Sequence, residues 1–511
     1  MSYPDLPNNI RKYQSEVVAI RGLNLSDNTQ DGDLCETRNI SCRRYPYFAT
    51  RRARSKLTPY ANATAITAWE KLVVVQGTNL LYDGAVVGQV AEGAKQFAVV
   101  NTKLVIWPDK KYLDIKTLTV QSLTAEASGA GAKFEADSIT VTGWSDLTTQ
   151  FKVGDTISVS GCTVQTGNNK NAYIKAVEAG KITVTSNCFT AATETATITL
   201  SRSVPDLDFI CESENRLWGC CNADKTIYAS ALGDPTNFFT YEGISTDSYA
   251  VAVGSEGNFT GCAKLSTSVL FWKENVLHKM LGSYPAEYAL YTYNVEGLQA
   301  GCHKSMQVVN ETLFYKGLHG IYAYSGGIPA LVSRQFGDHE FTDAVGGTDG
   351  VRYFLSVKEG ARSRLLAYDI QDGIWLEEDP TAAVDFARIG KDMYFLDSSG
   401  SVYLADTGEE DASIEWLMEF VPFYATINYR KRIRKLFLRV TVPAGAWLRV
   451  EARFDSGVWC EVGKIAGGPC DDVFTMPVQI ARCDKFGLRV SGVGPCCLLG
   501  LSREFSLGSD K

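Results

Sequence analysis

The chain has 511 residues, of which 45% are hydrophobic, and it carries a formal net charge of −8. A chain of this length exceeds a single hydrophobic core and predicts roughly two to four domains. The mild negative charge argues against a nucleic-acid binder held by bulk electrostatics, and no stretch approaches the roughly 18 consecutive apolar residues that a membrane span requires. The 45 glycines, 24 tyrosines and 23 phenylalanines, together with the scarcity of helix-period patterns, predict an all-β fold.

The first 60 residues show weak periodicity and are predicted to form an N-terminal arm without the apolar core of a secretory signal. The second half of this arm gathers basic side chains among Tyr45, Tyr47 and Phe48: Arg43, Arg44, Arg51, Arg52, Arg54 and Lys56. Arginine interleaved with aromatic residues suits contacts with acidic protein surfaces and with DNA. Two interpretations therefore stay open: a solvated charged arm, or an arm that docks on an acidic neighbour or lies near DNA.

Apolar strands that alternate with polar or glycine-containing turns begin near residue 61. The clearest hairpin is LFYKGLHGIYAYSGGIP, residues 313–329, in which two aromatic-rich strands flank a turn at Gly317. Seven degenerate copies of this unit can be counted, starting at Leu72, Leu104, Leu217, Val269, Leu313, Arg352 and Met393. The later copies start about 40 residues apart, which is the period of a four-stranded propeller blade. The repeat predicts a β-propeller of six or seven blades, with unrelated hairpins in a β-sandwich as the alternative.

The repeat stops between residues 116 and 202, where Thr, Ala, Gly, Ser and Val dominate and proline is absent. Three alternating segments predict short strands there: residues 151–162, 182–189 and 196–202. We interpret residues 116–202 as a small β-barrel or sandwich inserted between the blades of residues 61–115 and those of residues 203–424. Insertions into scaffold turns are thermodynamically tolerated and tend to carry contacts with partners.

Apolar and polar residues alternate regularly in the last part of the chain. WLRVEARFDSGVW (447–459) and CDKFGLRVSG (483–492) predict a half-buried antiparallel sheet, which closes as a β-sandwich or jelly roll over residues 425–511. A second basic segment precedes them: Arg430, Lys431, Arg432, Arg434 and Lys435. We regard this segment and the basic residues of the arm as candidates for lining a DNA channel or for contacting other proteins.

No constellation of residues predicts catalysis, a cofactor or a metal. Fourteen cysteines occur without the C-x-x-C pairs of a zinc site, and the four histidines are His278, His303, His319 and His339. The acidic triplet Glu377 to Asp379 could supply paired carboxylates for glycoside hydrolysis. Because neighbouring strand residues point to opposite faces, solvated charge is the preferred interpretation. We therefore expect a chain without enzymatic activity that is assembled in a reducing, intracellular environment.

Several stretches resemble a family of tailed-bacteriophage structural proteins. They are ENRLWGC (214–220), IYAS-LGDPTNF (227–238), STDSYAV (245–251), FTGC (259–262), FWKEN (271–275), GIYAYSGGIP (320–329), W-x-x-ED (375–379) and RCDKFGLRVSGVG…SREF-x-x-GSD (482–510). The resemblance covers the chain from about Arg43 to its C-terminus. It consists of structural turns rather than catalytic motifs, so it is specific to the family and not to a chemical role.

What the resemblance implies is a virion component at the tail or the head–tail junction. It is similar to the propeller-based hub and nozzle proteins of short-tailed phages, also called DNA-stabilisation or tail-tube proteins. Such proteins form rings around the DNA channel, usually of about six copies, and offer no catalytic residues. The implied partners are further copies of the chain, the portal or adaptor, other tail proteins and, without sequence preference, phage DNA. The implied location is the virion tail, after synthesis in the host cytoplasm.

Two other classes of protein stay open. A baseplate or host-surface adhesion module would use the insertion to bind glycan or protein. Its marker would be an exposed aromatic cluster, yet Phe134, Trp144, Phe151 and Tyr173 are scattered along the sequence. A polysaccharide-cleaving enzyme would need carboxylates that converge at the axial mouth of the propeller.

Overall fold

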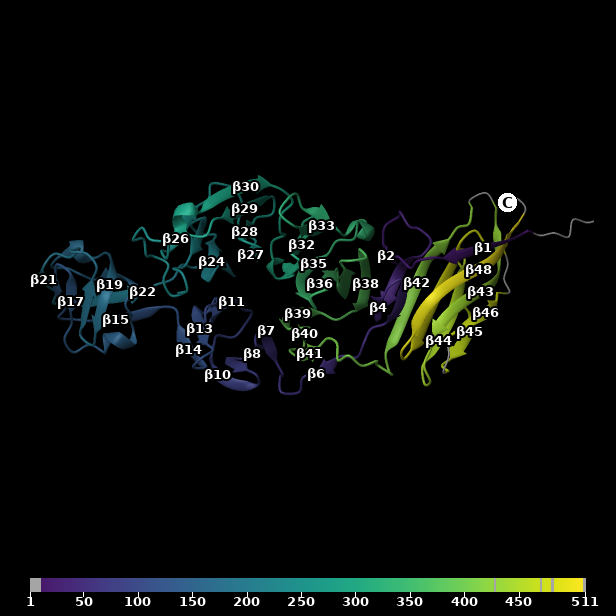
Figure 1. Ribbon diagram of the computed structural model, residues 1–511, viewed down its shortest axis with the longest axis horizontal. Helices are drawn as coiled ribbons and strands as arrows, with labels where there is room; N and C mark the ends of the chain where they lie inside the picture. Colours follow the sequence, from purple (N-terminus) through teal and green to yellow (C-terminus); the bar gives the residue numbers. More distant parts are fainter. Residues whose placement is uncertain (1–10, 427–428, 469–470, 479–481, 509–511) are drawn as a thin grey trace, which may run out of the picture. The chain divides into compact units, whose positions relative to one another are not determined.

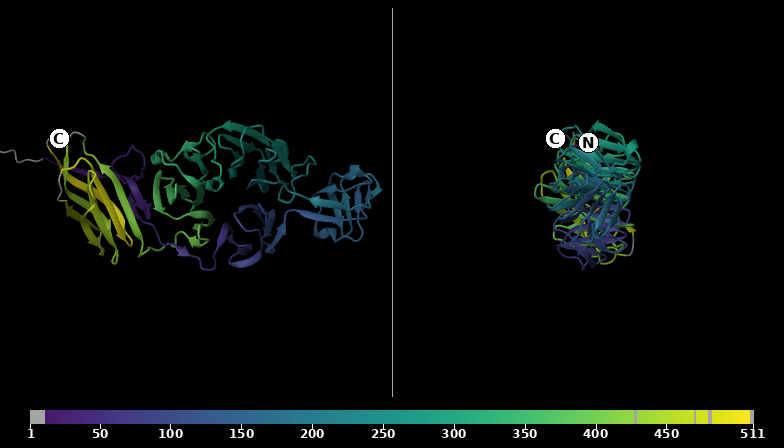
Figure 2. Two further views of the ribbon diagram at one scale, coloured as in Figure 1. Left: turned by 180° about the vertical axis from the view of Figure 1, so that it is seen from behind. Right: turned by 90° about the vertical axis from the view of Figure 1, so that its left-hand side faces the viewer.

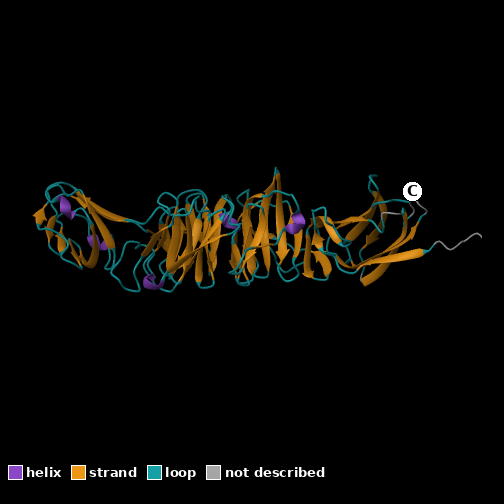
Figure 3. Cartoon of the chain, turned by 90° about the horizontal axis from the view of Figure 1, so that it is seen from above, coloured by secondary structure: helices purple, strands orange, loops and turns teal. Residues whose placement is uncertain are grey.

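The computed structural model describes residues 11–426, 429–468, 471–478 and 482–508. Strands dominate these ranges (Figure 3), and the helices described within them are single 3₁₀ turns: η1 (Leu147–Thr149), η2 (Thr166–Asn168), η3 (Pro285–Glu287), η4 (His303–Ser305) and η5 (Arg334–Phe336). The all-β class predicted from the sequence is confirmed. The chain divides into two compact units, one of Met1–Thr58, His319–Ala323 and Ala330–Lys511, the other of Pro59–Leu318 and Tyr324–Pro329.

Seven sheets of four strands follow one another through the described ranges (Figure 1). The first two contain β7 (Ala63–Trp69), β8 (Lys71–Gln76), β9 (Asn79–Tyr82) and β10 (Ala85–Gln89), then β11 (Gln96–Val100), β12 (Lys103–Trp107), β13 (Lys111–Asp114) and β14 (Thr119–Ser122). The third and fourth contain β23 (Phe209–Ser213), β24 (Arg216–Cys221), β25 (Thr226–Ala229) and β26 (Tyr249–Ala252), then β27 (Gly261–Leu265), β28 (Ser268–Trp272), β29 (Val276–Leu281) and β30 (Ala289–Asn294).

The fifth sheet contains β31 (Gln307–Val309), β32 (Thr312–Gly317), β33 (Gly320–Tyr324) and β34 (Ala330–Leu331). The sixth contains β35 (Thr342–Thr348), β36 (Arg352–Glu359), β37 (Arg362–Asp369) and β38 (Ile374–Asp379). The seventh contains β39 (Ala383–Ile389), β40 (Asp392–Asp397), β41 (Val402–Leu404) and, from the N-terminal part of the chain, β6 (Ser55–Lys56).

Central strands of these sheets are buried on both faces. Every residue of β24 and of β28 is buried, which is expected where consecutive sheets pack face to face. Trp218 of β24 and Phe271 of β28 share one such core. In the other unit, Phe354 of β36 and Met393 of β40 pack in the same way. Four-stranded sheets that follow one another in chain order are the blades of a β-propeller, and the described residues contain seven of them.

The C-terminal sandwich is built from both ends of the chain, which corrects the interpretation of residues 1–60 as an arm. One sheet contains β1 (Lys12–Val17), β4 (Ile40–Arg44), β5 (Tyr47–Thr50), β48 (Cys497–Leu507), β43 (Lys431–Thr441) and β46 (Asp471–Pro477). The other contains β2 (Gly22–Leu23), β3 (Asp33–Arg38), β42 (Glu415–Phe423), β47 (Phe486–Val493), β44 (Trp447–Phe454) and β45 (Cys460–Ala466). In Figure 2 the purple N-terminal strands lie beside the yellow C-terminal ones.

The pairing of the two chain ends has a simple physical reason. An open sheet edge presents unpaired backbone N–H and C=O groups, and the N-terminal strands supply partners for them. β1 pairs with β48 from Lys12 opposite Ser506 to Val17 opposite Leu501. Leu34 of β3 and Phe48 of β5 complete the core in which Trp416 and Leu436 are buried.

The insertion has a hydrophobic core of its own, in which Phe134, Ile157, Ile174 and Ile198 are fully or almost fully buried. Its eight strands run in the order β15 (Ala125–Gly129), β22 (Ile198–Arg202), β18 (Thr156–Ser160), β19 (Asn171–Glu178), β20 (Lys181–Val184), β17 (Ser138–Thr140), β16 (Lys133–Glu135) and β21 (Ala192–Thr193). The insertion begins later than predicted, because β14 is the outer strand of the second blade. The Thr- and Ser-rich sequence of β14 resembles that of the insertion, so composition placed the boundary too early.

Candidate interfaces

Four of the six basic side chains of the N-terminal segment are bound to carboxylates within their own unit. Arg54 donates to Asp379 at 2.6 Å and to Glu378 at 2.7 Å, and its side chain is only 11% exposed. Three further pairs follow the same pattern: Arg43–Glu410 (2.6 Å), Arg51–Asp379 (3.7 Å) and Arg52–Asp406 (3.8 Å). Arg44 and Lys56 are exposed. Most of the predicted interface residues of this segment therefore form ion pairs within the chain.

The acidic triplet is buried rather than solvated, which corrects the sequence interpretation. The register of β38 against β37 shifts by one residue and makes Glu378 part of a β-bulge. The bulge breaks the alternation on which the prediction relied, so that Glu378 and Asp379 both reach Arg54. Glu377 accepts a hydrogen bond from Arg362 at 2.6 Å. The three carboxylates are thus committed to ion pairs.

A cavity of about 430 Å³ opens among these ion pairs. Its charged lining residues are Arg43, Arg51, Arg52, Arg352, Lys391, Asp349, Glu378, Asp392 and Asp406. Arg352 holds Asp349 through two contacts of 2.9 and 2.8 Å. Five basic and four acidic side chains nearly balance, and most of them are paired, so the cavity lacks the surplus of positive charge that a phosphate site would have.

The second basic segment divides into buried and exposed side chains. Lys431 is fully buried, its Nζ donates to the carbonyl of Asp484, and burial lowers its pKa. Arg430 pairs with Asp455 at 3.2 Å, and the Nε of Arg434 donates to Ser506 at 3.3 Å. Arg432 and Lys435 are exposed on β43. Arg430, Arg432 and Lys435 are thus the side chains of this segment that face solvent, and of the three only Arg430 has a carboxylate partner among the described ion pairs.

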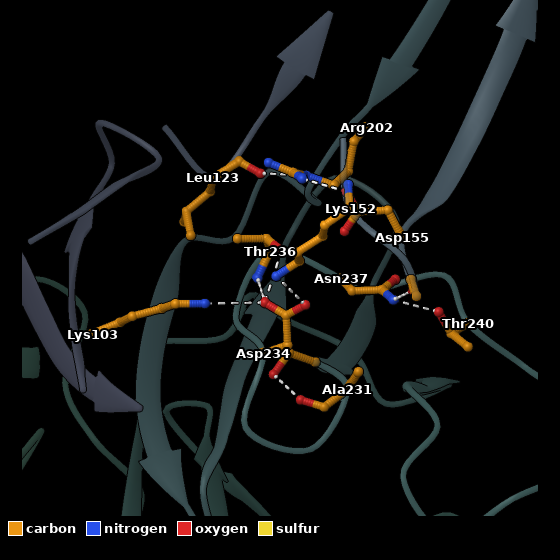
Figure 4. Close-up of polar contacts among 12 residues, drawn as sticks. Lys103, Leu123, Lys152, Asp155, Arg202, Ala231, Asp234, Thr236, Asn237 and Thr240 are labelled. Carbon is orange, nitrogen blue, oxygen red and sulfur yellow. Dashed lines mark hydrogen bonds and ion pairs between the residues drawn. The ribbon is translucent and has the colours of Figure 1, made fainter. Parts of the chain in front are cut away.

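A junction of polar contacts holds the insertion against the second and third blades (Figure 4). Asp234, in the connection between β25 and β26, binds Lys152 of the insertion at 2.8 Å and Lys103 of β12 at 3.4 Å. The amide of Asn237 donates to the carbonyl of Gly154 at 2.7 Å. Asp234 is therefore shared between the propeller and the insertion.

Arg202 closes the same junction from the end of β22. Its Nη1 binds Asp155 at 2.6 Å and its Nε donates to the carbonyl of Leu123 at 3.3 Å, just after β14. Thr156 adds a hydroxyl contact of 3.0 Å with Thr240. Both ends of the insertion are thereby tied to the blades, so its orientation is set by side chains as well as by its two linking segments.

Removing the charge of Asp234 is predicted to loosen this junction. Asp234→Asn leaves Lys103 and Lys152 without their shared partner, and we expect the docking of the insertion to weaken by roughly 1–3 kcal/mol. Amide hydrogen exchange should rise in residues 152–156 and 231–240 while the blades melt as before. Asp206→Asn is the matched control, because Asp206 pairs with Lys110 but its side chain is 89% exposed. Equal exchange in both variants would contradict the prediction.

Lowering the pH is expected to weaken the docking of the insertion, as Asp234→Asn does. Burial by itself would raise the pKa of Asp234, but Lys152 and Lys103 outweigh it and hold the pKa at about 2. A carboxylate whose pKa is lower in the folded state stabilises that state above its ordinary pKa of 3.8, and this contribution is lost as the pH falls towards 2. Burial raises the pKa of Asp155 despite Arg202, so Asp155 takes up its proton first.

One serine–histidine contact was not anticipated from the sequence. The Oγ of Ser255 lies 2.7 Å from Nε2 of His278, whose Nδ1 lies 2.9 Å from the hydroxyl of Thr292. Burial and the charge of Lys273 lower the pKa of His278 to about 4, which makes the imidazole a weak base. The group on Nδ1 is a hydroxyl rather than the carboxylate that orients a catalytic histidine. The contact suits a structural bridge between a loop and β30.

Within the described ranges, no group of three or more His, Cys, Asp or Glu side chains is arranged to hold a metal ion. No helix in those ranges is long and apolar enough to cross a membrane.

Comparisons with known proteins give no family. No protein-family model and no curated protein matches the sequence. Among solved structures, BamB from Moraxella catarrhalis is 10% identical, with 70% of this chain and 97% of that chain covered and a TM-score of 0.32. An exo-β-1,3-galactanase from Phanerochaete chrysosporium is 9% identical, with 56% and 92% covered and a TM-score of 0.23. The acylaminoacyl peptidase of Pyrococcus horikoshii is 11% identical, with 73% and 59% covered and a TM-score of 0.31. At these TM-scores the likenesses carry no argument about function.

Proposed function

We propose that the protein is a structural virion component of a tailed bacteriophage, a ring-forming tail hub, nozzle or head–tail junction protein around the DNA channel. The proposal rests on the sequence resemblance from about Arg43 onwards. The observation that supports it best is the architecture, in which a bladed scaffold carries an insertion with its own core and a sandwich made from both chain ends. This is the kind of architecture that the resemblance implies.

In this proposal the contacts between copies come from the insertion and the sandwich. Within each unit, neighbouring blades bury the faces that they turn to one another, so those faces are not available to a second chain. Exposed apolar side chains occur on both of the other modules: Val153, Val164, Val18 and Val458, which are 62%, 63%, 88% and 80% exposed. Such side chains are candidates for burial in an assembly.

The assembly can be tested directly on the purified chain. We expect light scattering after size exclusion to give a closed oligomer, of about six copies if the resemblance holds, and negative-stain images to show a ring with a channel. The measurement should be repeated with the portal and adaptor proteins of the same phage. A chain that stays monomeric at high concentration with those partners present would overturn the proposal.

Contact with phage DNA is a separate part of the proposal, and it is assigned to two exposed side chains of the second basic segment, Arg432 and Lys435 at the start of β43. Arg432→Glu with Lys435→Glu is expected to reduce DNA retention without changing the melting temperature, because both side chains face solvent. Binding should be indifferent to sequence and should weaken steeply with salt. Arg439→Glu is the matched control, an exposed arginine further along the same strand. Assembly defects that do not depend on salt would instead favour a role in protein–protein contact.

An alternative function is a baseplate or host-surface adhesion module. It is favoured by one observation, an open groove lined with tyrosines between two blade connections.

A further inference from the structure

A groove of about 480 Å³ lies between the β25–β26 and β29–β30 connections of the unit that contains the insertion. It is lined by Tyr241, Gly243, Ile244, Ser245, Asp247, Ser248, Tyr249, Ala250, Tyr284, Pro285 and Ala286. Tyr241 is 57% exposed and Ile244 56%, values that are high for large apolar side chains. The volume is in the range of small-molecule sites in proteins.

The wall of the groove is held in shape from below by a buried arginine. Arg216, only 1% exposed, donates to the carbonyls of Ser230 at 2.8 Å and Ser245 at 2.6 Å, and also to that of Asp247. Asp247 in turn accepts hydrogen bonds from the backbone of Gly243 at 2.6 Å and of Ile244 at 3.1 Å. The connection that carries Tyr241 is therefore ordered without a ligand, and this reduces the entropy lost on binding.

The tyrosine side chains are fixed in a similar way. The hydroxyl of Tyr241 donates to the carbonyl of Phe238 at 3.2 Å, and that of Tyr284 donates to Glu287 at 2.5 Å. Tyr249 packs edge-on against Tyr288 with ring centroids 4.9 Å apart. Burial raises the pKa of Tyr241 and of Tyr249, so their phenols stay protonated at neutral pH. The rings offer flat apolar faces with a hydroxyl at one end.

The charge around the groove restricts the ligand. Its lining contains one acidic residue and no lysine or arginine, and the charges of Glu242 and Asp247 help to raise the pKa of nearby Tyr173 in the insertion. Phosphate, DNA and acidic polysaccharides are thereby disfavoured. Flat tyrosine faces and serine hydroxyls are complementary to a ligand that has apolar C–H faces and many hydroxyls.

The geometry points to a carbohydrate-binding groove that takes a neutral saccharide, with Tyr241 and Tyr284 packing against sugar rings. The aromatic cluster is thus not where the sequence alternative placed it. In the insertion Phe134 and Phe151 are core residues. This inference does not depend on ring assembly or on a virion role, and its test uses the full chain in whichever oligomeric state it adopts.

Saturation-transfer NMR with three neutral probes, maltotriose, cellotriose and triacetylchitotriose, tests the groove. We expect at least one of them to bind, and Tyr241→Ala and Tyr284→Ala each to weaken that binding by about tenfold. Both side chains are partly exposed, so the melting temperature should not change. Tyr291→Ala is the matched control, because Tyr291 is 47% exposed on β30 and does not line the groove.

Heparin and a proline-rich decapeptide serve as probes for the other classes of ligand. The inference is overturned if none of the three saccharides binds at millimolar concentration, or if binding survives in both tyrosine variants. Binding of heparin or of the peptide alone would also overturn it, and would reassign the groove to a polyanion or a protein partner.

Discussion

Arg54→Ala is expected to lower the free energy of unfolding by about 3–5 kcal/mol, because it leaves the buried Glu378 without its cation and Asp379 with only its longer pair to Arg51, at 3.7 Å. Glu378 and Asp379 have side chains only 8% and 12% exposed, and Arg54 binds both. Arg54 also lies over the ring of Phe395 at 5.1 Å, so the substitution removes packing as well as charge. Since Arg54 precedes β6, the loss should detach the outer strand of the seventh blade first.

The measurement is the first transition in chemical unfolding, followed together with hydrogen exchange in residues 52–57. Arg52→Ala is the matched control. Arg52 pairs with Asp406 at 3.8 Å, and the two side chains are 39% and 45% exposed. Such a pair contributes about 0–1 kcal/mol. Arg54→Met combined with Glu378→Gln and Asp379→Asn should recover part of the stability. If the first unfolding transition of Arg54→Ala falls at the same denaturant concentration as that of the parent protein, the ion pairs of Arg54 do not stabilise β6.

Deleting the insertion at its structural boundaries is expected to leave the blades folded, whereas a deletion only slightly longer should not. Ala125 and Arg202 are opposite residues of the β15–β22 ladder, so a short Gly-Ser linker can join the chain on either side of them. Changes in loop length alter the closure cost by only about 0.6 kcal/mol per doubling. The variant lacking residues 125–202 should therefore be soluble, with blade stability close to that of the parent, and should fail in assembly or in partner docking.

The comparison variant lacks residues 118–200 and so loses β14. That strand pairs with β13 from Thr119 opposite Asp114 to Ser122 opposite Lys111, and its removal uncovers the edge of the second blade. We expect this variant to aggregate or to melt far below the parent protein. Yield in size exclusion and the melting temperature distinguish the two variants. Aggregation of the 125–202 deletion as well would mean that the insertion is part of the propeller core.

Local sequence patterns were sufficient for the fold class and for most of the strands from residue 61 onwards. Period-two alternation and glycine turns mark strands wherever they occur, so the blades, the insertion and the C-terminal sheets could be predicted without knowing their partners. The hairpin at residues 313–329 is an example, with β32 and β33 on either side of the turn. The sequence left the number of blades at six or seven. The seven four-stranded sheets of the described residues set it at seven.

The candidate sites were predicted less well, because they depend on residues that meet only in the folded chain. Tyr241 and Tyr284 lie in different blade connections, and nothing in either local sequence indicates that the two line one groove. Asp234 lies in a stretch, residues 227–238, that was noted only for the family resemblance, and its two lysine partners come from a blade and from the insertion.

By itself the sequence determined that this is an all-β protein with a repeated blade, an interrupted repeat and a different C-terminal sheet, since each of these leaves a periodic or compositional trace in the chain. Only the tertiary structure decided that the N-terminal segment completes the seventh blade and the sandwich, because strand pairing between distant segments has no local signature. It also decided that Arg51 and Arg54 of the basic segment pair with Glu378 and Asp379 of the acidic triplet in the interior. One shifted residue in β38 turns Glu378 towards Arg54, and a charge pattern read along a strand cannot reveal such a shift.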